Sequence, residues 1–301
     1  MATTKILISP SSFASVNNLP MEQLQDQGFD IVNNPYGRKL TKDELLQLLP
    51  GVTGTIAGLE PLTREVLAAS DLKVISRCGI GMDSVDIDAA HDLGIKVFNT
   101  PDAPTLAVAE LTVGMMLTIP RQVKAMDASL HQRKWDKRIG MQLQGKTLAI
   151  IGFGRIGRKL SELLKPFDMR LQIFDPYLQE SGFCSSLQEA LSGADIVTLH
   201  ASGNKVIFGS EEFKLMNPGV FVLNASRGTL IDENALVDAL KNDIVAGAWL
   251  DTFPVEPYEG ILCDFEQVIM TPHATSYSVQ CRLAMETESV KNLLIGLVIN
   301  D

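Results

Sequence analysis

The sequence predicts an α/β protein built from two doubly wound parallel sheets, with one domain inserted in the other. Three observations predict this class. Residues 147–175 form a pattern of strand, glycine turn, helix, strand and acid. Short apolar runs alternate with helical patterns on both sides of that unit, which favours parallel sheets covered by helices. A last apolar helical pattern over 279–297 follows the final strand, and we expect it to return to the first domain.

The unit over 147–175 carries a dinucleotide-binding pattern. An apolar strand runs into Gly152, Gly154 and Gly157, and a helical pattern follows at once. The first glycine permits a tight turn, the second lets the backbone approach a pyrophosphate, and the third lets the helix pack on the strand. Free N–H groups at the start of the helix favour the phosphate anion. The predicted cofactor contacts in this turn are Gly152, Gly154, Arg155, Ile156 and Gly157.

Asp175 ends the second strand of this unit, eighteen residues after Gly157. A carboxylate at that position can accept hydrogen bonds from both ribose hydroxyls, and it repels a 2′-phosphate. The sequence therefore predicts NAD as the cofactor, in preference to NADP. The alternative from the residues alone is a structural turn with Asp175 as a surface cap.

The remaining apolar runs set the domain boundaries. The expected strands are 6–8, 30–32, 54–57, 74–76 and 96–98 in the first part, and 147–151, 171–174, 196–199, 220–223, 246–250 and 268–270 in the second. The second set has the six strands of a complete Rossmann sheet. A long helix is expected over 105–128, where Pro120 should kink it or break it in two. We expect a flavodoxin-like substrate-binding domain over 1–100, an inserted Rossmann NAD-binding domain over 101–275, and a returning helix within 276–301.

Composition excludes several other classes of protein. The chain has 301 residues, 46% of them apolar, and a net charge of −10. These values describe an ordinary soluble globular protein, and the charge argues against nucleic acid or an anionic membrane as the main partner. Four cysteines lie far apart without a paired motif, so we expect reduced thiols and no metal site. The first strand follows the N-terminus directly, which predicts no signal peptide and a cytoplasmic protein.

Chemically active residues follow the strands of the second domain. In open α/β sheets, functional groups gather at the carboxyl ends of the strands. Those ends supply His200, Arg227, Asp251 and His273, with Glu256 in the loop after Asp251. A guanidinium grips a substrate carboxylate, a histidine takes a proton as hydride leaves, and a glutamate orients the imidazole. This set of groups suits oxidation of a 2-hydroxy acid.

Nearly the whole chain resembles the D-isomer-specific 2-hydroxyacid dehydrogenases, and in particular their phosphoglycerate dehydrogenase branch. The motifs that carry the resemblance lie at residues 77–83, 99–101, 109–112, 132–135, 152–157, 224–228, 247–251 and 271–273. The resemblance implies that Arg227 clamps the substrate carboxylate, that His273 is the acid/base and that Glu256 is its partner. It also implies a homodimer formed by the Rossmann domains.

Further site residues follow from the same resemblance. It implies that backbone N–H groups in the loop after residue 76 bind the substrate carboxylate, so the predicted substrate contacts are Arg77, Cys78, Gly79, Ile80 and Arg227. It places Asp251 near the nicotinamide amide. His200, as a cofactor-wall or structural residue and not a base, and Ala225 are the other predicted cofactor contacts.

The chain also departs from the phosphoglycerate branch. That branch carries an arginine in the loop that here spans 57–61, where this sequence has Glu60 and no cation. If the substrate is phosphorylated, we expect Arg77 to hold it together with Lys137 or Arg138 of a second subunit. Trp249 and Tyr277 are further departures. Two alternatives stay open: a glyoxylate, hydroxypyruvate or other 2-ketoacid reductase, and an NAD(H)-sensing scaffold without activity.

Overall fold

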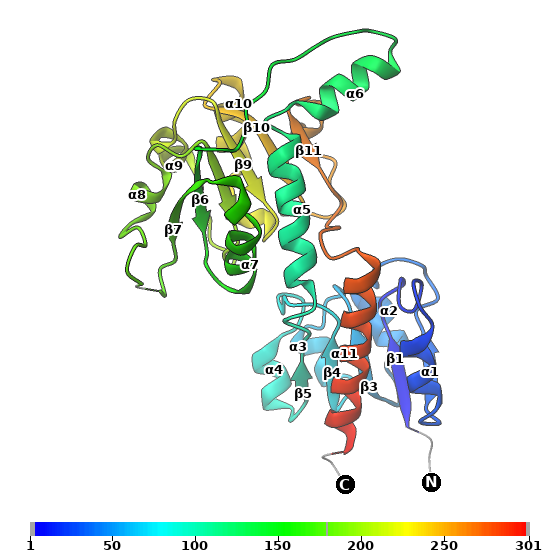
Figure 1. The fold of residues 1–301 in the computed structure, drawn as a ribbon. Coiled ribbons are helices and arrows are strands. Elements are labelled where there is room, and N and C mark those ends of the chain that lie inside the picture. Colours follow the sequence, from blue (N-terminus) through cyan, green and yellow to red (C-terminus); the bar gives the residue numbers. More distant parts are fainter. Residues whose placement is uncertain (1–3, 179, 299–301) are drawn as a thin grey trace. The chain divides into compact units, whose positions relative to one another are not determined.

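The computed structural model describes residues 4–178 and 180–298 and divides the chain into two compact units. Unit 1 combines Met1–Pro104 with Tyr277–Asp301, and unit 2 is Thr105–Ser276. Each unit is a parallel sheet with helices on both faces, which is the predicted fold class (Figure 1). The outermost residues of the predicted boundaries, 1–3 and 299–301, lie outside the described residues.

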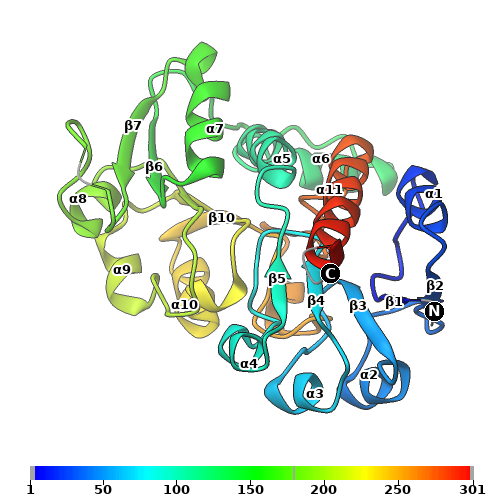
Figure 2. The ribbon, with the colours of Figure 1, turned by 90° about the horizontal axis from the view of Figure 1, so that it is seen from below.

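Unit 1 has the flavodoxin-like strand order that we expected, β2-β1-β3-β4-β5. Its strands are β1 (Lys5–Ile8), β2 (Asp30–Asn33), β3 (Val52–Ala57), β4 (Val74–Arg77) and β5 (Lys96–Phe98). Its helices are α1 (Leu19–Gln25), α2 (Lys42–Leu48), α3 (Arg64–Ala68), α4 (Ile87–Asp92) and α11 (Val279–Val298). Helices α1 and α11 cover one face of the sheet, and α2, α3 and α4 cover the other (Figure 2).

The returning helix α11 belongs to the core of unit 1. It contacts β3, β4 and β5, far away in the sequence. Gly296 permits this close approach, since a Cβ atom there would lie 2.5 Å from the side chain of Val74. The Ser76 hydroxyl also donates a hydrogen bond to the backbone oxygen of Ser289, 2.7 Å away. The C-terminal helix therefore fixes the strand that leads into the predicted substrate loop.

Unit 2 contains the six strands that we expected. They are β6 (Thr147–Ile151), β7 (Arg170–Phe174), β8 (Ile196–Leu199), β9 (Val220–Asn224), β10 (Val245–Leu250) and β11 (Val268–Met270). The helices are α5 (Pro104–Thr118), α6 (Val123–His131), α7 (Arg155–Leu163), α8 (Leu187–Leu191), α9 (Ser210–Leu215) and α10 (Glu233–Lys241), with short 3-10 turns η1 (Lys165–Phe167), η2 (Gly228–Leu230) and η3 (Ile261–Asp264).

The strand order of unit 2 is β11-β10-β9-β8-β6-β7, so the order reverses between β6 and β8. A six-stranded Rossmann sheet usually places its third strand outside the second. Here one backbone hydrogen bond, from Cys184 N–H to Ile173 O at 2.8 Å, stands in place of that strand. The predicted strand count is confirmed, but the order differs from the usual arrangement. The reversal beside β6 still creates the edge where ligands bind in open α/β sheets.

The long helix expected over 105–128 is broken in two, as Pro120 predicts. Helix α5 ends at Thr118 and α6 begins at Val123. Between them Gln122 has a left-handed φ of +53°. Proline lacks the N–H that an uninterrupted helix needs. Within the described residues, neither of these helices nor any other is long and apolar enough to cross a membrane.

The core of unit 2 lies on both faces of its sheet. Helices α8, α9 and α10 pack on one face, where Ala248 and Leu250 of β10 point. Residues of α5 and α7 pack on the other face, where Trp249 points. Alternate residues of a strand face opposite sides of a sheet, so all of β10 is buried apart from Ala246. This buried strand leads directly to Asp251.

Candidate active site

The glycine turn after β6 has the shape of a pyrophosphate cradle. Gly152 has a φ of +94°, and a Cβ atom there would lie 2.6 Å from the backbone nitrogen of Ala201. A Cβ atom at Gly157 would lie 2.5 Å from the oxygen of Gly152, so α7 packs tightly on the turn. Gly154 differs, because no atom of the described residues lies within 4 Å of its Cβ position.

The start of α7 is open to an anion. The helix begins at Arg155, and no side chain among the described residues caps it at Gly154. Its first N–H groups have no partner within the helix, and the helix dipole favours negative charge there. Ile156 is half-buried beside the same turn. The turn therefore fits a dinucleotide pyrophosphate.

Asp175 closes the turn at the end of β7. Its Oδ2 accepts a hydrogen bond from Phe153 N–H at 2.8 Å, and its Oδ1 accepts one from Tyr177 N–H at 2.9 Å. These bonds fix the direction of the carboxylate. Each carboxylate oxygen has a second lone pair, so ribose hydroxyls can still donate to it. Asp175 thus acts as a turn cap and keeps the acceptors that the ribose prediction requires.

His200 lies beside the glycine turn at the end of β8. A Cβ atom at Gly152 would also lie 2.6 Å from the carbonyl carbon of His200. The His200 Nε2 is 3.0 Å from Thr198 Oγ1, and its buried Nδ1 has no partner among the described residues. Burial lowers the pKa of His200 to about 4, so the ring is neutral near pH 7. A neutral ring with an unpaired nitrogen suits a wall of the cofactor site better than a base.

His273 and Glu256 form the pair that the sequence suggested. Nδ1 of His273 lies 3.0 Å from Oε2 of Glu256, and both side chains are about one-third exposed, at 32%. Glu256 is itself held by the backbone, since its Oε1 accepts a hydrogen bond from Phe253 N–H at 3.0 Å. The pairing leaves Nε2 as the imidazole nitrogen that faces away from Glu256.

Asp251 fixes the turn that carries His273. Its carboxylate is fully buried, and it accepts hydrogen bonds from the N–H groups of Ala274 and Thr275 at 2.8 and 3.1 Å. Its backbone oxygen accepts a hydrogen bond from His273 N–H at 2.8 Å. The carboxylate of Asp251 therefore faces this turn, and its contact with a nicotinamide amide stays a prediction.

Arg227 is positioned by the turn after β9. The side-chain amide of Asn224 donates to the Arg227 oxygen at 2.8 Å, which closes the turn. A Cβ atom at Gly228 would lie 2.1 Å from the carbonyl carbon of Phe253, so only glycine fits there. Strands β9, β10 and β11 are neighbours, and their carboxyl ends share one edge of the sheet. Arg227, half-buried Ala225 and His273 thus gather at the edge where His273 contacts its glutamate.

The predicted substrate loop of unit 1 follows β4. The Cys78 N–H donates to Ala57 O at 2.8 Å, and the Gly79 N–H donates to Thr100 Oγ1 at 2.8 Å. Both groups were predicted to face the substrate carboxylate, but both are engaged within the unit. Ile80 is half-buried, and its backbone oxygen accepts from the side-chain amide of Asn99. Burial raises the pKa of the Cys78 thiol to about 11, so it is not a thiolate near pH 7.

Arg77 is folded back against its own loop. Its side chain is almost fully buried, and Nη1 donates to the backbone oxygen of Cys78. Gly79 has a φ of +143°, which favours glycine, and a Cβ atom there would also overlap the guanidinium. Arg77 therefore braces the loop from within unit 1.

Glu60 is buried in the same region, with 2% of its surface exposed. Its two carboxylate oxygens lie 2.9 and 3.0 Å from Gly58 N. Burial raises the pKa of Glu60, and hydrogen bonds to Gly58 and Ser9 and the charge of Arg77 oppose that rise. The loop therefore places a buried acid, and no cation, in the region where a substrate phosphate was expected to bind.

Two other residues singled out in the sequence have local partners. Arg138, predicted to reach a phosphate, lies 3.3 Å from Glu266 within unit 2. The Tyr277 ring stacks on the Arg282 guanidinium, with 5.0 Å to the ring centroid. An effect of Tyr277 on the substrate pocket stays a prediction.

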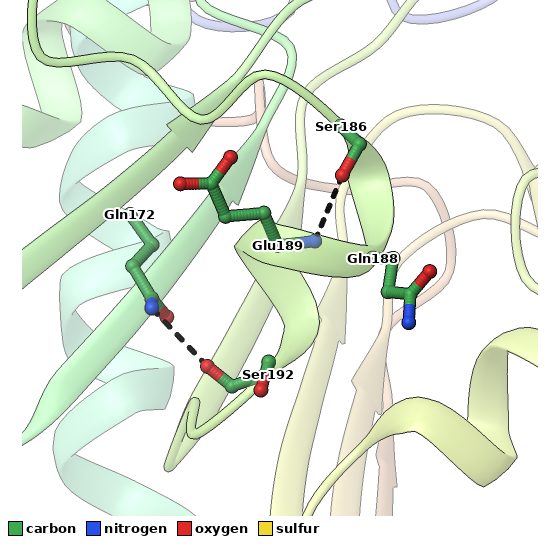
Figure 3. A pocket seen from close by; sticks show the side chains of 5 residues that line it. All are labelled: Gln172, Ser186, Gln188, Glu189 and Ser192. Carbon is green, nitrogen blue, oxygen red and sulfur yellow. Dashed lines mark hydrogen bonds between the residues drawn. The ribbon is translucent and has the colours of Figure 1, made fainter.

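A hollow in unit 2 lies away from these residues. It measures about 460 Å³ and is lined by Gln172, Ser186, Gln188, Glu189 and Ser192 (Figure 3). These side chains come from β7, α8 and the residues that flank α8, and the Gln172 amide donates to Ser192 O at 3.1 Å. The hollow contains none of the predicted site residues. Among the residues that the structure describes, no group of three or more His, Cys, Asp or Glu side chains could hold a metal ion.

Comparison with known proteins identifies the family. Residues 113–275 match the D-isomer specific 2-hydroxyacid dehydrogenase, NAD binding domain. The chain belongs to the D-isomer-specific 2-hydroxyacid dehydrogenase family. NAD is therefore the cofactor that the domain binds, in agreement with the glycine turn and Asp175.

Individual members of the family are similar over most of this chain. The D-3-phosphoglycerate dehydrogenase of Methanocaldococcus jannaschii is 37% identical over 276 residues, which is 85% of this chain and 52% of that protein. The chain spans about half the length of the curated relatives it matches. Among solved structures, the TT0316 protein from Thermus thermophilus has a TM-score of 0.89 at 30% identity, covering 98% of this chain and 97% of that one. A glyoxylate reductase from Paecilomyes thermophila has a TM-score of 0.85 at 26% identity, covering 98% and 95%.

Sequence reasoning missed two contributors to the site. Thr271 was noted only as part of a family motif, yet its hydroxyl lies 2.6 Å from Asp251 Oδ1. Glu60 was noted as a departure, but its burial was not foreseen. The role of Thr271 did have a signal in the sequence, because a threonine and a proline stand directly before His273 at a strand end. The sequence held no comparable signal for the second, because an acid in a loop is usually exposed.

Proposed function

We propose that this protein is an NAD-dependent D-2-hydroxyacid dehydrogenase, with His273 as the acid/base. The contact of His273 with Glu256 at 3.0 Å carries the proposal. In the oxidation, the substrate hydroxyl gives its proton to Nε2 of His273. Glu256 stabilises the imidazolium that forms. NAD, when bound, would supply the acceptor for the hydride that leaves C2. In the reduction, the same proton returns to the C2 oxygen.

Arg227 completes the proposed chemistry at the edge of unit 2. A guanidinium can hold a carboxylate with two parallel hydrogen bonds, which fixes the direction of C2. An NAD(H)-sensing scaffold is the remaining alternative. It is disfavoured because binding alone needs no histidine–carboxylate pair. Turnover of NADH with a 2-keto acid, followed by absorbance, separates the two.

The substrate we propose first is D-3-phosphoglycerate, which would place the enzyme in serine biosynthesis. The names of the curated relatives support it. An unphosphorylated 2-keto acid, such as glyoxylate or hydroxypyruvate, is the second candidate. The loop over 57–61 favours this second candidate, because it holds the buried Glu60 and no cation that could pair with a phosphate.

A comparison of two substrates tests the assignment. If phosphoglycerate is the substrate, kcat/KM for 3-phosphohydroxypyruvate should exceed that for hydroxypyruvate by at least tenfold, about 1.4 kcal/mol. Glu60→Gln replaces the acid near Arg77 with an amide that cannot ionise, and it should raise this ratio further. Ser84→Ala, in the same unit and near Gly58, is a control that leaves the charge unchanged. Equal kcat/KM for both substrates in the wild type would exclude phosphoglycerate as the specific substrate and favour an unphosphorylated 2-keto acid.

The cofactor preference gives an independent prediction. We expect strong preference for NADH over NADPH. In Asp175→Ala, we expect a smaller ratio of kcat/KM with NADH to kcat/KM with NADPH. The carboxylate accepts ribose hydrogen bonds and repels a 2′-phosphate, and each effect is worth about a kcal/mol or more. The measurement is kcat/KM with both cofactors. Wild-type protein that uses NADPH as well as NADH would contradict the prediction.

We further propose a cytoplasmic homodimer formed by unit 2. Its support is a set of exposed apolar side chains on α5, α6 and the following segment: Leu117, Val123, Leu130, Trp135 and Ile139. Two of them, Trp135 and Ile139, are 80% and 96% exposed. Single apolar residues on a surface are common, but so many exposed ones within residues 117–139 favour an interface there. The free cysteines agree with a reducing compartment.

A further inference from the structure

A chain of hydrogen bonds joins the core of unit 2 to the turn that carries His273. Trp249 is fully buried, and its indole Nε1–H donates to Thr271 Oγ1 at 2.9 Å. The Thr271 hydroxyl in turn donates to Asp251 Oδ1 at 2.6 Å. Asp251 then holds the N–H groups of Ala274 and Thr275, on the far side of His273.

The chemistry of these groups determines which atom donates and which accepts in each of these hydrogen bonds. An indole N–H can only donate, whereas a hydroxyl can donate one hydrogen bond and accept others. Because Thr271 Oγ1 accepts from Trp249, its single hydrogen is directed to Asp251. Oδ1 of Asp251 therefore receives two donors, the hydroxyl and the Ala274 N–H, and Oδ2 receives the Thr275 N–H. A buried carboxylate is costly unless such donors surround it.

The turn needs this support because His273 has an unusual backbone. Its φ is +51°, in the left-handed region that residues other than glycine rarely adopt. Such a conformation persists only where the surrounding structure fixes it. The bonds that fix it here centre on Asp251, whose backbone oxygen also accepts from His273 N–H.

Trp249 anchors these hydrogen bonds in the buried core of the unit. It lies on β10, between β9 and β11, and it packs among the buried residues on the α5 and α7 face of the sheet. Thr271 follows β11, where its N–H donates to Leu250 O at 3.0 Å. Both ends of the Trp249–Thr271 bond are therefore held by the sheet itself.

We propose that Trp249 is a positioning residue for His273, acting through the Thr271 hydroxyl and Asp251. The proposal rests on the proposed function, in which His273 is the acid/base. It assigns a role to a tryptophan that touches neither His273 nor the reacting atoms. If the indole N–H or the hydroxyl is lost, the turn relaxes and His273 moves away from Glu256.

The test compares Thr271→Val, Thr271→Ser and Trp249→Phe with the wild type. Hydride transfer from NADH to hydroxypyruvate is followed by stopped flow from pH 5 to 10, with NADH affinity and Tm measured alongside. Thr271→Val, which is isosteric but lacks the hydroxyl, should slow the step at least tenfold and move the basic limb of the profile to lower pH. Thr271→Ser keeps the hydroxyl, so it should retain the wild-type rate and the wild-type pH profile. Trp249→Phe should shift the profile in the same direction by a smaller amount.

Two further variants make the outcome specific. Ile269→Val removes a methylene from the same apolar cluster, and it should lower Tm without moving the pH profile. Glu256→Gln tests the proposed function itself. If Glu256→Gln moves the basic limb but Thr271→Val leaves it at the wild-type position, the role of Trp249 is wrong and the acid/base assignment stands. If Glu256→Gln also leaves the basic limb at the wild-type position, the acid/base assignment fails, and the role of Trp249 fails with it.

Discussion

Replacing His273 with alanine is expected to slow hydride transfer by about two to four orders of magnitude, the usual contribution of a positioned general acid or base. The side chain is one-third exposed and does not belong to the core, so the fold should survive the change. Single-turnover NADH oxidation with a 2-keto acid measures the effect, and NADH titration checks that the cofactor still binds.

Glu256→Gln should retain more activity than His273→Ala, but the pH dependence of its rate should differ from that of the wild type. Carbonyl reduction requires the imidazolium, so its rate falls where the ring loses its proton as pH rises. A carboxylate 3.0 Å from Nδ1 stabilises the positive charge that the imidazolium carries. The amide carries no charge, and the basic limb should therefore move to lower pH.

A matched control separates these effects from the general loss of a histidine. His91 lies exposed in the last turn of α4, far from any predicted site residue of unit 2 in the sequence. His91→Ala should retain the wild-type rate and pH profile. An unchanged profile in Glu256→Gln would show that the two side chains are not coupled. A His273→Ala variant with near wild-type single-turnover rates would remove this residue from the chemistry.

The features that the sequence predicted well are those determined by short-range patterns. All five expected strands of unit 1 and all six of unit 2 form where apolar runs of strand length occur. The helix signals were equally local: Thr41 and Glu44 form a capping box at the start of α2, and the chain leaves helical geometry around Pro120. The glycine turn was predictable from its sequence pattern, and two of its glycines, Gly152 and Gly157, lie where a Cβ atom would clash with backbone atoms.

Features that depend on contacts between distant strands could not be predicted. The Trp249–Thr271 bond joins residues 22 positions apart, and nothing in the local pattern of either residue indicates it. The buried Glu60 interacts with Ser9 and Arg77, which come from two other strand ends. The left-handed backbone of His273 is fixed by Asp251, from the neighbouring strand. Pairing of charged and polar groups across a sheet edge depends on strand order, which single-sequence patterns do not determine.

Gly152→Ala is expected to damage both the stability of unit 2 and its affinity for NAD. The new Cβ atom would lie 2.6 Å from backbone atoms of His200 and Ala201, and the φ of +94° is unfavourable for alanine. Strain of this kind costs about 1–3 kcal/mol, and backbone atoms cannot move aside as a flexible side chain can. We expect Tm to fall by about 5 °C or more. NAD affinity should fall at least tenfold, about 1.4 kcal/mol.

Gly154→Ala is the matched variant, because it adds the same methyl group where no described atom lies within 4 Å. Its φ is −73°, which alanine adopts readily. Tm should therefore stay within about 2 °C of the wild type, since surface changes of this kind cost little. The methyl group would nevertheless occupy the cradle above the start of α7, so NAD affinity should fall about tenfold. Calorimetric titration with NAD and thermal unfolding without it distinguish the two variants. Full NAD affinity in Gly154→Ala would show that the pyrophosphate does not lie against this turn.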